Sequence, residues 1–116
     1  MNDCSMNQFQ QQATKTAIYR KNMKSRTERL SYCTLGLTSE AGEVAGKLKK
    51  VLRDNKGYIG FQEAHDLRKE VGDVLWYCAM IMDELALSLG GCAEEVLRKL
   101  ADREKRGQLG GSGDER

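Results

Sequence analysis

The stretch Ser-Glu-Ala-Gly-Glu-Val-Ala-Gly-Lys-Leu-Lys-Lys, residues 39–50, places Glu40 and Glu43 three residues apart within a helical pattern of apolar residues. Later in the chain, Lys-Glu-Val-Gly-Asp-Val-Leu-Trp-Tyr contains a second pair, Glu70 and Asp73, with the same spacing. Residues i and i+3 share one face of an α-helix, so each pair can share a partner. Two such helices side by side would direct four carboxylates at one point, where like charges raise their pKa values. A hard divalent cation, which prefers oxygen ligands, would remove this conflict.

The composition favours a single all-α domain. The chain has 116 residues and no proline, and its middle is rich in Ala, Leu, Glu, Lys and Arg, which are good helix formers. A net charge of +2 is too small to indicate nucleic-acid binding. No apolar run approaches the roughly 20 residues of a membrane span, and the sequence contains no secretory signal pattern. We therefore expect a cytoplasmic protein that binds neither nucleic acid nor membrane.

Apolar residues at helical spacing predict four helices, over residues 6–23, 27–53, 61–89 and 92–105. The expected fold is a four-helix bundle in which the long second and third helices carry the carboxylates beside their apolar seams. Residues 1–106 would form one domain. The remaining residues, 107–116, contain Gly-Gly-Ser-Gly and are predicted to be a disordered C-terminal tail.

Glycines mark two features of these helices. Gly90 and Gly91 are predicted to end the third helix. Gly36, Gly42 and Gly46 lie inside the second, where each costs up to about 1 kcal/mol relative to Ala. Their presence near two carboxylates suggests that a neighbouring backbone or a ligand comes close. The alternative is a helix that kinks or ends near Gly36.

The ligand types indicate which metal a site of this kind would hold. Carboxylates without Cys or His ligands suit Mg²⁺, with Mn²⁺ able to substitute. A di-iron bundle would need Glu-x-x-His pairs, but Gln62 stands three residues before His65, the only histidine. The cysteines form no Cys-x-x-Cys pair, which argues against a zinc site, and without a secretory signal a disulfide framework is a minor alternative. The alternative for the carboxylates is solvated surface, but two pairs beside apolar seams, each with a central glycine, favour the metal.

Basic residues could hold the phosphates that a carboxylate-bound Mg²⁺ commonly binds. Lys47, Lys50 and Arg53 extend the stripe of Glu40 and Glu43, and further basic residues line the fourth helix. Each of them alone is also what an ordinary solvated surface would carry.

This pattern resembles the MazG-like superfamily of all-α nucleoside triphosphate pyrophosphohydrolases. Glu-Ala-Gly-Glu at 40–43 and Glu-Val-Gly-Asp at 70–73 match its Glu-x-x-Glu and Glu-x-x-Asp motifs, and the flanking Gly-Leu-Thr-Ser and Val-Leu-Trp-Tyr match as well. The resemblance implies Mg²⁺-dependent hydrolysis of a (d)NTP between the α and β phosphates, yielding a nucleoside monophosphate and pyrophosphate. It also implies a homodimer or homotetramer with sites completed between subunits.

The resemblance also assigns roles by position. The metal ligands would be Glu40, Glu43, Glu70 and Asp73. Glu40 or Glu43 would be catalytic, orienting or deprotonating the attacking water. The substrate-binding residues would be Lys47, Lys99 and Arg103 for the phosphates and Trp76 or Tyr77 for the base.

Two other functions remain open at this stage. Phosphoribosyl-ATP pyrophosphohydrolase shares the fold and the metal chemistry of this superfamily. A non-catalytic helical oligomerisation or adaptor module is the alternative from another class, in which the carboxylates pair with basic residues of a partner helix.

Overall fold

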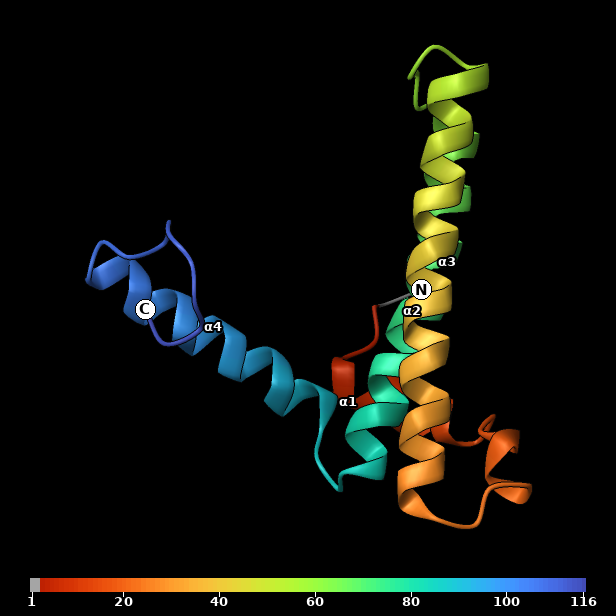
Figure 1. The fold of residues 1–116 in the computed structure, drawn as a ribbon, viewed down its shortest axis with the longest axis vertical. Helices are drawn as coiled ribbons and strands as arrows, with labels where there is room; N and C mark the ends of the chain where they lie inside the picture. Colours follow the sequence, from red (N-terminus) through yellow and green to blue (C-terminus); the bar gives the residue numbers. More distant parts are fainter. Residues whose placement is uncertain (1–2) are drawn as a thin grey trace.

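A long helical hairpin dominates the molecule. The computed structural model describes residues 3–116, and the expected all-α architecture is confirmed over that range, where no strand occurs. The hairpin consists of α2 (Arg26–Asp54) and α3 (Phe61–Glu84), and α1 (Met6–Thr14) packs against its base (Figure 1). A short 3₁₀ turn, η1 (Ile18–Lys21), joins α1 to α2. The last helix, α4 (Leu89–Lys105), projects away from the hairpin (Figure 1).

The first helix is shorter than predicted, and the chain turns immediately beyond its end. It starts at a capping box formed by Ser5 and Gln8 and stops at Thr14, where the pattern predicted a helix to residue 23. Just beyond, the Thr16 hydroxyl accepts a 2.9 Å hydrogen bond from the indole nitrogen of Trp76 on α3. Local hydrogen bonds, such as that from the Thr16 amide to the Ala13 carbonyl at 2.9 Å, form the turn that leads into η1.

The third helix also ends before the predicted glycines. Ala86 adopts the left-handed conformation (φ 57°), and the Leu87 amide donates to the Met82 carbonyl at 2.8 Å, as in a Schellman motif. Gly90 and Gly91 instead lie in the first turn of α4, and the Gly90 amide donates to Asn7 of α1. The predicted stop at these glycines was therefore wrong, since an alanine supplies the left-handed residue.

The second helix is continuous through its glycines. It starts at Ser25, whose hydroxyl accepts from the Glu28 amide, and shows no break at Gly36. A Cβ at Gly36 would overlap the ring of Tyr77, so this glycine allows α3 to come close. Nothing lies within 4 Å of a Cβ at Gly42 or Gly46. The expected close approach is therefore found at Gly36 alone of the three.

The packed core is small and lies at the base of the hairpin. It comprises Ala13, Tyr19, Cys33, Ala79, Met80 and Leu89. The four cysteines, all within the described range, are unpaired, and Cys33 is fully buried. Residues 3–116 contain no single helix long and apolar enough to cross a membrane. Taken together, α3 and α4 are long and apolar enough, but the two helices are bent by 100° relative to each other.

A single chain leaves an unusual amount of surface exposed. Its accessible area is 8626 Å², against about 6,300 Å² for a compact monomer of this mass. The radius of gyration is 17.1 Å, against about 13 Å for a compact chain of this length. Part of the excess is the apolar face of α4, where Val96, Leu97 and Leu100 are exposed by 44%, 65% and 40%.

Candidate metal centre

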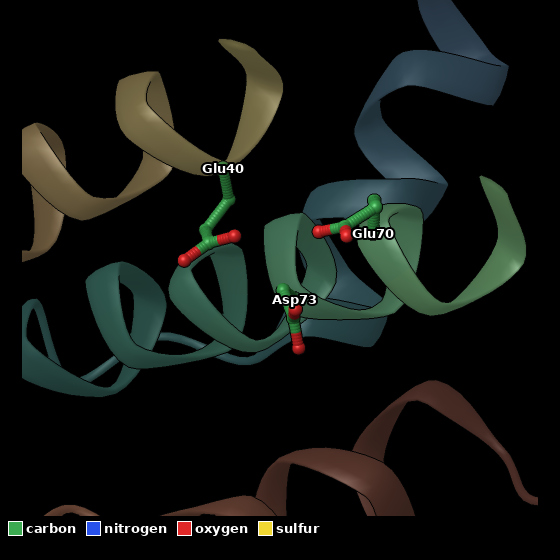
Figure 2. Close-up of side chains that lie close together, drawn as sticks. All are labelled: Glu40, Glu70 and Asp73. Atoms are coloured by element: carbon green, nitrogen blue, oxygen red, sulfur yellow. The ribbon is translucent and has the colours of Figure 1, made fainter. Parts of the chain in front are cut away.

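Three carboxylates from the two hairpin helices converge halfway along the hairpin. Glu40 reaches from α2 toward α3, which carries Glu70 and Asp73 one turn apart (Figure 2). One oxygen from each of the three lies within 4.8 Å of the others. Because the hairpin helices are antiparallel neighbours, the two sequence motifs face each other across their seam. Three carboxylates at this separation can share one cation, and the all-oxygen ligand set fits Mg²⁺ or Mn²⁺.

The electrostatics of the cluster favour an added positive charge. Partial burial, and then the charges of Asp73, Glu70 and Glu43, raise the pKa of Glu40. A carboxylate surrounded by others resists ionisation, and a bound cation reverses that effect.

The fourth predicted ligand, Glu43, lies outside this group of three. It is exposed on α2, although its charge contributes to the raised pKa of Glu40. Residues i and i+3 differ by about 60° around a helix, and the rotation of α2 against α3 puts Glu43 on the exposed side of this pair. Whether Glu43 is a ligand or handles the attacking water stays a prediction.

Lys47 is the basic side chain that reaches the cluster. Its ammonium group lies 3.9 Å from a carboxylate oxygen of Glu70, across the hairpin. On the side toward the hairpin tip lies a cleft of about 310 Å³, whose polar lining comprises Lys47, Lys50, Asn55, Glu63 and Asp66. Lys47, which contacts Glu70 and lines this cleft, is therefore the nitrogen donor within reach of a group bound at the carboxylates.

On the opposite side, toward the hairpin base, the cluster borders an aromatic pocket. This pocket of about 350 Å³ is lined by Thr16, Glu40, Asp73, Trp76 and Tyr77. The two rings meet edge to face with centroids 5.0 Å apart. Burial and the neighbouring Tyr32 raise the pKa of Tyr77 to about 12, so its hydroxyl stays protonated at neutral pH. The pocket thus offers aromatic surface and a hydroxyl donor beside the carboxylates.

A buried carboxylate holds the helices that form this pocket. Glu84 at the end of α3 accepts hydrogen bonds from Tyr19, Arg20 and Arg29, all at 2.8–2.9 Å. Burial opposes ionisation of Glu84, but the hydrogen bonds from these partners outweigh it and lower its pKa. Tyr19 in turn stacks on Tyr32 with centroids 4.9 Å apart. The sequence analysis missed Thr16, Tyr19 and Glu84, because no local pattern marks contacts between residues so far apart in the chain.

The two other predicted phosphate contacts, Lys99 and Arg103, are not at the carboxylates of their own chain. They lie on α4, which projects away from the hairpin (Figure 1), and both contact Asp114 of the tail. Their role in substrate binding stays a prediction.

The site is thus defined by an all-α hairpin in which three carboxylates lie close enough together to hold a metal ion. The family model for the MazG nucleotide pyrophosphohydrolase domain matches residues 29–107, and the chain belongs to this family. The chain is also similar to the Gene 37 protein of Mycobacterium phage L5, with 44% identity over 109 residues that cover 93% of this chain and 96% of the relative. No solved structure matches the chain. The resemblance inferred from the carboxylate motifs is thereby confirmed.

Proposed function

We propose that the protein is a Mg²⁺-dependent nucleoside triphosphate pyrophosphohydrolase that cleaves a (d)NTP between the α and β phosphates. The observation that carries the proposal is the convergence of Glu40, Glu70 and Asp73 within 4.8 Å. Membership of the MazG family supports the reaction class. A bound Mg²⁺ would supply positive charge to the phosphate oxygens and activate water.

The order of groups along the hairpin supports one orientation of the substrate. The aromatic pocket with Trp76 lies on the base side of the carboxylates, and Lys47 lies on the tip side, about 10 Å along α2 from Glu40. In this orientation the base lies against the aromatic rings and the terminal phosphates lie at Lys47. The α and β phosphates then lie at the carboxylates. Cleavage there releases pyrophosphate on the lysine side.

Each side chain then has a defined task. Glu40, Glu70 and Asp73 would hold the cation, and Lys47 would neutralise charge on the departing pyrophosphate. Glu43, the exposed neighbour of Glu40 on α2, accepts a proton from the attacking water in this proposal. The Tyr77 hydroxyl donates a hydrogen bond to the substrate, and Trp76 provides a stacking surface.

We further propose that the protein works as a homo-oligomer. The apolar face of α4 and an accessible surface well above that of a compact monomer support this proposal. Sedimentation equilibrium tests it, and Leu97→Asp, in the middle of the apolar face, should lower the mass to that of one chain. Arg98→Asp introduces the same carboxylate on the exposed neighbouring position and should leave the mass unchanged. Equal masses for the two variants would contradict the assignment of this face.

The reaction is tested with a panel of NTPs, dNTPs and phosphoribosyl-ATP in the presence of Mg²⁺, with products separated by anion exchange. Monophosphate plus pyrophosphate would support the proposal and identify the base and sugar preference, and turnover of phosphoribosyl-ATP alone would select that alternative. Diphosphate plus phosphate as products would be consistent with the metal site but would refute cleavage between the α and β phosphates. No turnover and no effect of Mg²⁺ on melting would favour the adaptor module. A cytoplasmic location stays a prediction.

A further inference from the structure

The tail segment, residues 107–116, folds back along α4. The helix ends in a Schellman motif in which Gly107 is left-handed (φ 69°) and the Gln108 amide donates to the Arg103 carbonyl at 2.7 Å. The following turns bring Asp114 over the helix face that carries Lys99 and Arg103. The segment therefore covers the two basic residues that the family resemblance assigns to phosphate binding.

The contacts of Asp114 are those of an anion bound by two cations. Its carboxylate lies 2.8 Å from the Lys99 ammonium and 3.3 Å from the Arg103 guanidinium. The backbone carbonyl of Asp114 also accepts from Arg103, at 2.6 Å. Lys99 and Arg103 stand one helical turn apart, so their charges act on the same point.

The tail leaves this cationic pair incompletely satisfied. Arg103 is 5% exposed, yet its Nε is buried without a hydrogen-bond partner, and its contacts with the tail all use Nη2. A guanidinium binds carboxylate or phosphate best through two parallel hydrogen bonds. Asp114 contacts the guanidinium through both its carboxylate and its backbone carbonyl, but both accept from the single nitrogen Nη2.

We propose that Asp114 acts as an internal competitor, occupying the site for phosphate oxygens that the family resemblance assigns to Lys99 and Arg103. A phosphate group carries more charge and more acceptor oxygens than one carboxylate, so it can displace Asp114 and use both Nε and Nη2 of Arg103. The proposal rests on the proposed function in that the phosphate comes from the nucleotide substrate or from released pyrophosphate. The tail then weakens the binding of either.

The test is calorimetric titration of inorganic pyrophosphate into the full chain at low salt, with EDTA present to keep divalent cations from the carboxylate cluster. Asp114→Ala should bind pyrophosphate about two- to fivefold more tightly, as expected for release of partly exposed ion pairs. Glu115→Ala changes the net charge equally, one position along the same tail, and should leave the affinity unchanged. Equal affinities for these two variants would overturn the proposal.

A third variant locates the effect. In a Lys99→Gln background, Asp114→Ala should gain less than it gains in the parent chain, because one of the freed cations is absent. An undiminished gain would place the pyrophosphate elsewhere and refute the assigned site. The titration requires no turnover, so it can succeed where the proposed reaction fails. If turnover occurs, a lowered KM in Asp114→Ala identifies the nucleotide as the ligand, whereas stronger inhibition by pyrophosphate alone identifies the product.

Discussion

Replacement of Gly36 by alanine tests the contact that brings the two hairpin helices together. The new Cβ would overlap three ring atoms of Tyr77, so the ring or the helices must move. Insertion of a methyl group into a packed site typically costs about 1–3 kcal/mol. The same substitution gains up to about 1 kcal/mol of helix propensity, which partly offsets the cost.

Gly46→Ala is the matched control, since it lies in the same helix with nothing within 4 Å of the new Cβ. The propensity gain is common to both variants and cancels in their difference. We therefore expect Gly36→Ala to be less stable than Gly46→Ala by about 1–3 kcal/mol. Urea unfolding followed by circular dichroism at one protein concentration measures this difference.

A second comparison assigns the effect to the ring. In a Tyr77→Ala background the obstacle is removed, so Gly36→Ala should become neutral or stabilising. Equal stability of Gly36→Ala and Gly46→Ala in the parent chain would refute the argument that Gly36 is required for close packing. In the active protein, Gly36→Ala should also raise KM, because Tyr77 lines the pocket beside Glu40.

Three further predictions follow from the site and its supports. Saturating Mg²⁺, at 100 times its dissociation constant, should stabilise the chain by about 2.7 kcal/mol in a melting titration, and Glu40→Gln but not Glu28→Gln should abolish this effect. Glu84→Gln should cost about 1–3 kcal/mol at pH 7. Because folding lowers the pKa of Glu84, the stability that its ionised form contributes is present above about pH 4.3 and is lost as the pH falls further. The difference in unfolding free energy between the parent and Glu84→Gln should therefore disappear in acid-unfolding curves. Thr16→Val should shift the fluorescence of Trp76, the only tryptophan, and raise KM more than it lowers kcat; an unchanged spectrum would contradict the 2.9 Å contact.

The regular helices and the carboxylate pairs were predictable because they depend on local periodicity. Apolar residues at helical spacing located α2 and α3, and the i, i+3 spacing placed Glu70 and Asp73 on one face. The same spacing could not establish that Glu40 faces α3 while Glu43 faces solvent, since that depends on how the two helices are rotated against each other.

What could not be predicted depends on contacts between distant residues or on unusual backbone conformations. The hydrogen bond between Thr16 and Trp76, just beyond the early end of the first helix, joins residues 60 positions apart. Ala86 takes the left-handed conformation where glycine is the usual residue, which moved the end of α3 away from Gly90.

The uneven distribution of the core along the hairpin has a consequence for its local unfolding. Tyr19, Cys33 and Met80 pack at the base, whereas toward the tip the described residues bury Val51 alone among the hydrophobics. Segments with few buried contacts open with a smaller free energy than the whole molecule, so amide hydrogens near residues 49–64 should exchange faster with deuterium than those at the base. The carboxylates lie at the boundary between these regions. A cation bound there would link α2 to α3. It should slow amide hydrogen exchange at the tip and leave exchange at the base unchanged.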